Sequence, residues 1–235
     1  MARVVKAADV RRNEILATAY RLFVRDGYDA TTVNAILDAI GLSKGAFYHH
    51  FESKEEVMQA LALRMAEEMH AKLSPLVARR DLAPIEKLRL MFAAGTQYKK
   101  ENVSMVRAVA DLYCREENLR LRQRIVAAAM EVAGPLFTRI LDEGVRDGSF
   151  DVEHPAETAR LLMHLGTFIH DAWADAMKRA VTDLPGAMAL IRRLFDAYVA
   201  ALARILGVER RALGLDELMD DETLALFLRP EDPDA

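Results

Sequence analysis

The chain has 235 residues, of which 52% are hydrophobic and 29% are charged, with 32 lysine and arginine residues against 36 aspartate and glutamate residues. This composition is typical of a globular protein, and the length allows one large domain or a small domain joined to a larger one, at about 150 residues per domain. The formal net charge of -4 excludes a protein that coats nucleic acid or an anionic membrane over its whole surface, but a local basic patch remains compatible with it.

The sequence carries no sign of export or of membrane insertion. Cys114 is the only cysteine, so the chain forms no internal disulfide. Residues 1–12 contain four basic side chains without the apolar stretch of a secretory signal. Because no uninterrupted apolar run approaches the roughly 18 residues of a membrane span, we expect a cytoplasmic protein.

Hydrophobic residues recur with a helical period almost throughout, which predicts an all-α fold. The first expected helix covers residues 10–24, and Gly27 can close its C-terminus. A mobile basic arm is also expected, with Arg3, Lys6, Arg11 and Arg12. The second helix is capped by Thr31 or Thr32, and one apolar face follows from the spacing of Val33, Ile36, Leu37 and Ile40.

A steep connection and a very short helix come next. Residues 41–43 read Gly-Leu-Ser, in which the glycine can end one helix and the serine can cap another. The third helix has room for residues 44–51 only, and a helix this short is unstable alone. Phe47 and Phe51 share one face and are expected to hold it against the first two helices, which leaves the face with Tyr48 and His49 available.

Longer helices are expected after this unit. A capping box at Ser53 and Glu56 begins the first of them, and Pro84 suits the first turn of the next. The remaining helices are expected over residues 104–114, 117–146, 155–180, 185–206 and, as a short last helix before an acidic tail, 215–228.

A short, polar-faced helix after a glycine-containing turn is typical of a helix-turn-helix, which places its second helix in the DNA major groove. Lys44 can reach a phosphate or a guanine edge, and Tyr48 and His49 offer hydrogen bonds. Gly45 and Ala46 are small enough to let the helix backbone approach the bases. Residues 1–55 hold eight basic and seven acidic side chains, so their charge supports this only mildly. The alternative is a solvated face of a helical subdomain that does not bind DNA.

The same residues resemble a known family. The resemblance rests on Thr31-Thr32-Val33, Ile36, the run from Ala39 to Phe51, and Ser53-Lys54-Glu55-Glu56. This pattern is similar to the DNA-binding domain of TetR-family (TetR/AcrR) transcriptional regulators and covers about the first 60 residues. The resemblance implies that Phe47 and Phe51 are core residues. It assigns DNA contacts, including those to phosphates, to Thr32, Ser43, Lys44, Gly45, Ala46, Tyr48, His49 and Lys54.

The resemblance also implies a homodimer, formed by the last two long helices, and a small-molecule pocket among the central ones. The helices over residues 155–180 and 185–206 are apolar over a wide arc, and we expect them to form the interface. Two-fold symmetry would place the recognition helices about 34 Å apart, which matches a palindromic operator. The expected pocket residues combine deformable apolar surface with a few polar groups: Met91, Phe92, Tyr98, Met105, Tyr113, Phe137, His164, Phe168 and Trp173.

The sequence therefore predicts a sequence-specific, homodimeric repressor that is released from its operator by a small lipophilic or aromatic effector. Residues 1–56 form the expected DNA-binding domain, residues 57–207 the expected ligand-binding and dimerisation domain, and residues 208–235 a short helix and acidic tail. No catalytic residue, cofactor or metal ligand is expected, because the chain lacks a glycine-rich phosphate loop and an H-E-x-x-H pair. The alternative is an all-helical enzyme or metal-binding bundle that carries a vestigial helix-turn-helix.

Overall fold

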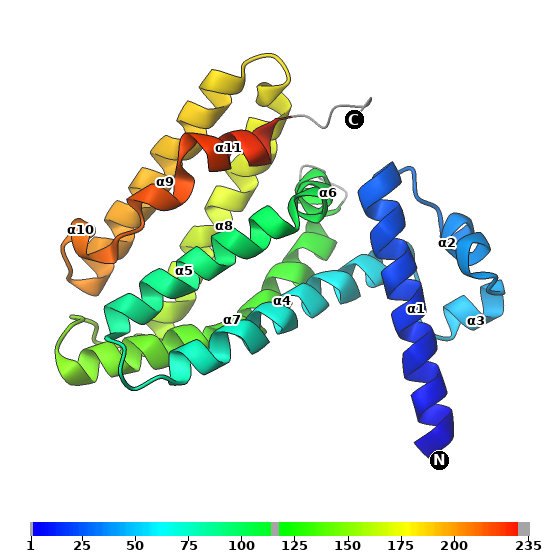
Figure 1. Cartoon of the computed structure of the whole chain (residues 1–235), viewed down its shortest axis with the longest axis horizontal. Helices are drawn as coiled ribbons and strands as arrows, with labels where there is room; N and C mark the ends of the chain where they lie inside the picture. Colours follow the sequence, from blue (N-terminus) through cyan, green and yellow to red (C-terminus); the bar gives the residue numbers. More distant parts are fainter. Residues whose placement is uncertain (1, 114–117, 230–235) are drawn as a thin grey trace.

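The computed structural model describes the backbone of residues 2–113 and 118–229, and the side chains of residues 9–109, 118–169, 172–173 and 175–229. All regular structure in these ranges is helical, which confirms the predicted fold class. A head of three helices, α1 (Ala2–Asp26), α2 (Val33–Ile40) and α3 (Lys44–Tyr48), stands at one end, and α4 (Lys54–Ala78) leads from it into a larger helical body (Figure 1). No helix in the described ranges is both long and apolar enough to be a membrane span.

The body contains five further long helices and a short C-terminal segment. The long helices are α5 (Pro84–Glu101), α6 (Val103–Tyr113), α7 (Leu119–Asp147), α8 (Pro155–Ala180) and α9 (Leu184–Leu206). The C-terminal segment consists of α10 (Arg210–Leu213), the 3-10 helix η2 (Asp216–Met219) and α11 (Asp221–Leu228). In Figure 1 this segment folds back along α9, and α11 ends close to α6. Cys114 and Glu117 lie outside the described residues.

Two expectations about the head are wrong in detail. The expected mobile arm is helical, because α1 begins at Ala2 and no helix-breaking residue interrupts the segment before residue 10. Further along the same helix, Arg11 forms an ion pair with Glu14 at 2.7 Å. The third helix ends at Tyr48 rather than residue 51. The turn that follows it directs Phe51 into the core, where its side chain is buried.

The expected C-terminal helix over residues 215–228 is also wrong, since the chain is interrupted there. Gly214 adopts a left-handed conformation, with a φ of 60°, and ends α10. Asp220 then starts a new helix, because its carboxylate accepts a hydrogen bond from the backbone N–H of Thr223 at 2.8 Å. Gly214 thus separates α10 from η2, and Asp220 separates η2 from α11.

Among the described side chains, buried apolar residues form three clusters. The first lies in the body among α4, α5, α7, α8, α9 and α10, and the third joins α8 and α9 to α11. The second is the core of the head, but it extends into the body through α4, α6 and α7. The residues that the body adds to the head core are Val57, Met58, Leu61, Met105, Ala108, Leu121 and Ile125. The expected division at residue 56 therefore does not separate two hydrophobic cores.

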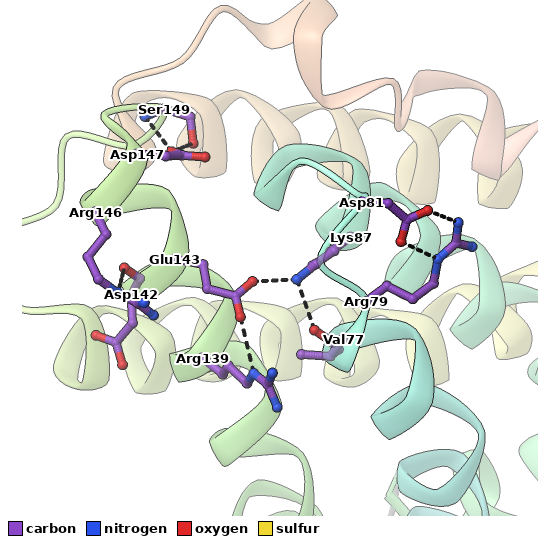
Figure 2. A network of polar contacts seen from close by, with 10 residues as sticks. All are labelled: Val77, Arg79, Asp81, Lys87, Arg139, Asp142, Glu143, Arg146, Asp147 and Ser149. Atoms are coloured by element: carbon purple, nitrogen blue, oxygen red, sulfur yellow. Dashed lines mark hydrogen bonds and ion pairs between the residues drawn. The ribbon is translucent and has the colours of Figure 1, made fainter.

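A polar network fixes the end of α4 against α5 and α7 (Figure 2). The Lys87 side chain is only 3% exposed, and its ammonium donates to the Val77 carbonyl at 2.9 Å and to the carboxylate of Glu143. Arg139 donates to the other oxygen of that carboxylate at 3.1 Å. Burial acts to raise the pKa of Glu143, but the hydrogen bonds from Lys87 and Arg139 outweigh it, so the pKa is lowered. The carboxylate therefore stays charged and holds the three helices together.

Candidate DNA interface and effector site

Local hydrogen bonds set the angle between α2 and α3. Thr32 caps α2, because its hydroxyl oxygen accepts from the N–H of Ala35 at 3.1 Å. Gly41 ends that helix with a φ of 62°, a left-handed conformation that favours glycine. Ser43 then caps α3 by accepting from the N–H of Ala46 at 3.3 Å. The sequence left Thr31 or Thr32 open as the cap, and the buried Thr31 instead donates its hydroxyl to the Gly27 carbonyl at 2.8 Å.

The short helix α3 has one buried and one exposed face. Phe47 and Phe51 are buried, with ring centroids 6.0 Å apart, and they fix α3 against the rest of the head. Tyr48 is 55% exposed and stands edge-on to the ring of Phe47 at 5.4 Å. Other candidate DNA contacts are also exposed: Thr32, Ser43, Lys44, Gly45 and His49, with Ala46 half-buried. The structure therefore gathers these residues on and beside one rigid, solvent-facing helix.

Lys54, the remaining candidate, has a structural task in addition to any contact with DNA. Its ammonium donates to the carbonyls of Tyr28 at 2.7 Å, Thr31 at 2.9 Å and Asp29 at 3.4 Å, and it lies 4.1 Å from the centroid of the Tyr28 ring. These bonds tie the start of α4 to the loop between α1 and α2. Nothing in the local sequence pattern indicates this contact, because it joins residues more than 20 positions apart.

The capping box before α4 differs slightly from the expected arrangement. The hydroxyl oxygen of Ser53 accepts from the N–H of Glu56 at 3.2 Å, as predicted. The Glu56 carboxylate, however, accepts from the N–H of Glu52 at 2.6 Å, one residue before the cap. The box therefore fixes the turn between α3 and α4 as well as the beginning of α4.

The expected pocket residues do not meet in one cavity. Met91, Phe92 and Phe137 lie in or against the body core, where Phe92 packs edge-on to Phe137 at 6.0 Å. Met105 belongs to the head core and Trp173 to the C-terminal core. The other members are distributed as follows: Tyr98 is buried, His164 and Phe168 are exposed on α8, and the side chain of Tyr113 lies outside the described residues.

Tyr98 shows how burial affects one of these residues. Its hydroxyl donates to the Glu68 carboxylate at 3.2 Å. Burial, followed by the negative charge of Glu68, raises the pKa of Tyr98 to about 12. The phenol is therefore a neutral donor that joins α5 to α4.

A groove of about 930 Å³ lies between α7 and α8. Its apolar lining comes from Val126, Ala127, Met130, Gly134, Pro135, Ala156 and Met163. Its polar lining comes from Arg122, Gln123, Glu131, Thr138, Arg139, Asp142, Arg160, His164 and Thr167. Among the expected pocket residues whose side chains are described, only His164 lines it, because the sequence pattern indicated which residues are apolar but not which helix faces would meet.

Comparison with known proteins agrees with the geometry of the head. Residues 15–61 match the model of "Bacterial regulatory proteins, tetR family". The chain is 30% identical over 159 residues to the transcriptional repressor KstR2 of Rhodococcus jostii, covering 63% of this chain and 72% of that protein. It is 27% identical over 163 residues to KstR2 of Mycolicibacterium smegmatis, covering 69% and 78%.

Solved structures with low sequence identity share the fold. A TetR-family regulator from Pectobacterium atrosepticum aligns with a TM-score of 0.66 at 19% identity, covering 86% of this chain and 96% of that one. FadR from Bacillus subtilis, solved in complex with stearoyl-CoA, aligns with a TM-score of 0.55 at 18% identity, covering 92% and 96%. These likenesses support the assignment of the whole helical architecture.

An exposed recognition helix on a helix-turn-helix head, joined to a helical body, defines a DNA-binding transcriptional regulator. The chain belongs to the tetR family of bacterial regulatory proteins. The relatives are regulators, and the comparisons do not support the alternative of an enzyme with a vestigial helix-turn-helix. In the described part of the chain no three His, Cys, Asp or Glu side chains come together as metal ligands.

Proposed function

We propose that the protein is a repressor that binds a palindromic operator as a homodimer and is released from it by a small effector. The observation that carries the DNA-binding part is the face of α3: Phe47 anchors the helix, while Lys44, Tyr48 and His49 are exposed on it. A regulator of chromosomal DNA acts in the cytoplasm, where we place this one.

The candidate residues divide into two kinds of DNA contact. Tyr48, His49 and Lys44 meet base edges or neighbouring phosphates in the major groove, and Gly45 and Ala46 allow the backbone of α3 to approach. Thr32, Ser43 and Lys54 meet phosphates at the beginnings of α2, α3 and α4, where free N–H groups and the helix dipole favour an anion. To contact a phosphate, the Lys54 ammonium must redirect one of its N–H donors from a loop carbonyl, or share that donor between the carbonyl and the phosphate.

An exposed apolar strip on α8 supports the dimer. Leu161, Leu165 and Phe168 follow one another at helical spacing and are 61%, 41% and 62% exposed. Monomeric proteins rarely leave such strips in water, and a second copy of the chain related by a two-fold axis would cover two strips at once. We place the interface on α8 and the adjacent α9, in the position expected from the sequence.

We place the effector in the groove between α7 and α8. Met130 and Met163 supply deformable apolar surface there, and Arg160 is an exposed cation for which no ion pair is found among the described side chains. The charged residues of the lining are three cations, Arg122, Arg139 and Arg160, and two carboxylates, Glu131 and Asp142, so cations outnumber acidic groups there. This chemistry fits an amphipathic molecule with an acidic head and an apolar tail.

Selection of DNA from a random duplex library with the full chain at physiological salt tests the DNA-binding proposal. We expect enrichment of a palindrome whose half-site centres are about one helical turn apart. The Tyr48→Ala variant is the matched control, because Tyr48 is exposed and its loss leaves the core intact. Failure of the wild-type chain to enrich any sequence would overturn the proposal. Equal enrichment by the variant would remove Tyr48 from the interface.

Thermal unfolding with decanoate and with decan-1-ol tests the effector class. A ligand that binds only the folded state raises the melting temperature by mass action. We expect a larger shift with decanoate than with the alcohol, and loss of that difference in the Arg160→Met variant. Equal shifts with both molecules would contradict recognition of an acidic head.

A further inference from the structure

The two faces of α6 lie in different cores. Met105 and Ala108 are buried in the head cluster, and α6 lies against α1. Val103, on the other side of the helix, packs against the C-terminal cluster that contains Phe227. A shift of α6 relative to one core must therefore disturb its packing in the other, because packed cores have discrete arrangements.

Arg107 strengthens the contact between α6 and the C-terminal helix. It follows Val103 by one helical turn, and its guanidinium donates to the Leu226 carbonyl in α11 at 2.6 Å. Leu226 lies in the last turn of α11, where carbonyls have no donor within the helix. A positive charge at this end also complements the helix dipole. The contact joins residues 119 positions apart in the sequence.

The helix α11 is in turn anchored in the body. Leu224, Phe227 and Leu228 are buried, and Phe227 packs edge-on against Trp173 of α8 with ring centroids 5.6 Å apart. Asp221 forms an ion pair with Arg192 of α9. Because an eight-residue helix is not stable alone, these contacts determine where α11 lies.

We propose that Arg107 is a positioning residue for DNA binding and that the docked C-terminal helix sets operator affinity through it. The bond to Leu226 holds α6, α6 packs against α1, and α1 belongs to the head that contains the recognition helix. Figure 1 shows α11, α6 and α1 in this order. Release of α11 lets the head sample more orientations, so DNA binding then loses preorganisation and becomes weaker. This inference rests on the proposed function.

Full-length variants test the proposal from both sides of the contact. Arg107→Leu removes the bond from α6, and Phe227→Ala loosens α11 without changing a residue of α6. The control is Arg146→Leu, which removes a comparable bond from an arginine to a backbone carbonyl, that of Asp142 at 3.1 Å, in the last turns of α7 (Figure 2). Affinity for the selected duplex is measured for each variant and for the double variant Arg107→Leu/Phe227→Ala.

We expect Arg107→Leu and Phe227→Ala each to weaken operator binding by about twofold to thirtyfold, the usual range for coupling through packed elements. The double variant should bind no more weakly than the weaker single variant, since both changes break one connection. Arg107→Lys, which keeps a cationic donor, should recover most of the affinity, and Arg146→Leu should bind as the wild type does. Additive losses in the double variant, or unchanged affinity after release of α11, would overturn the proposal.

Hydrogen exchange of the free protein decides the same question without DNA. In Arg107→Leu and Phe227→Ala, amides of α6 and α1 should exchange faster than in the wild type and in Arg146→Leu. Faster exchange confined to α11 would overturn the proposed connection. If no duplex is selected at all, the proposed function fails, while the exchange of α6 and α1 still supports or refutes the link to α11.

Discussion

Gly45 offers a sharp test of how DNA meets the head, because stability and affinity should change in opposite directions. It is exposed in α3, its φ lies outside the left-handed region, and a Cβ atom built on it meets no other atom within 4 Å. Nothing within the protein therefore requires a glycine at this position. If the backbone of α3 approaches the bases closely, it is the bound DNA that requires a small residue at this position.

The expected magnitudes follow from this geometry. Replacing glycine by alanine inside a helix stabilises it by about 0.5–1 kcal/mol, so Gly45→Ala should raise the melting temperature by roughly 1–4 °C. Gly45→Leu also meets open space and should fold, but it places four carbons between α3 and the groove. The loss of about one base contact corresponds to about 1–3 kcal/mol, or roughly fivefold to more than a hundredfold in affinity.

The assay combines thermal unfolding with titration of the selected duplex. Gly95→Leu is the matched control: Gly95 lies in α5, far from the head along the chain, and a Cβ atom there also meets nothing within 4 Å. We expect the Gly95 variant to keep wild-type affinity. Wild-type affinity in Gly45→Leu would refute close approach of α3 to DNA at this point, and unfolding of that variant would refute the open space around it.

Three further changes separate DNA contact, assembly and stability. Tyr48→Ala should weaken operator binding and leave the melting temperature and dimerisation almost unchanged; an unaltered affinity would exclude a contact by this side chain. Phe168→Glu should shift the sedimentation behaviour from dimer to monomer, whereas the same kind of change at Val10, which is 57% exposed in the head, as Val10→Glu, should not. Glu143→Gln should destabilise the fold by about 3 kcal/mol in urea unfolding, because it leaves the buried Lys87 ammonium uncompensated, and adding Lys87→Met should recover most of this. Since the pKa of Glu143 is lowered, its contribution should be complete above its ordinary value of 4.5 and be lost as the pH falls through the lower folded-state value.

The head could be predicted closely because its signals are local. Ser43 and Ser53 cap helices through hydrogen bonds to residues three positions away, and these spacings are visible in the sequence. Phe47 and Phe51 are four positions apart, so a helical pattern predicts that both face the core, and both are buried although α3 ends at Tyr48. The end of α3 was missed by three residues because the need to bury Phe51 outweighs the tendency of the helix to continue.

The distribution of the expected pocket residues over three cores and the surface could not be predicted, because it depends on which helix faces meet. Trp173 is large and apolar, as expected of a pocket residue, but it packs against Phe227 of α11, 54 positions later in the sequence. The sequence pattern predicts a longer helix there, over residues 215–228. Phe168 is on the same helix as Trp173 and is exposed instead. The sequence shows which residues are apolar and which of them share a helix face. Whether an apolar face lies in a core, an interface or a groove depends on tertiary packing.

The same packing explains how a body without DNA contacts can influence a small head. The hydrophobic core of residues 1–56 is completed by apolar side chains from outside this segment. They come from α4, α6 and α7: Val57, Met58, Leu61, Met105, Ala108, Leu121 and Ile125. Each fully buried large apolar side chain contributes about 1.5–3 kcal/mol, so these residues together provide on the order of 10 kcal/mol, comparable to the stability of a whole domain. The head therefore shares its hydrophobic core with the body. A rearrangement of α6 or α7 necessarily changes the free energy of the head, and a ligand that favours one arrangement of the body changes the affinity of α3 for DNA by the same coupling.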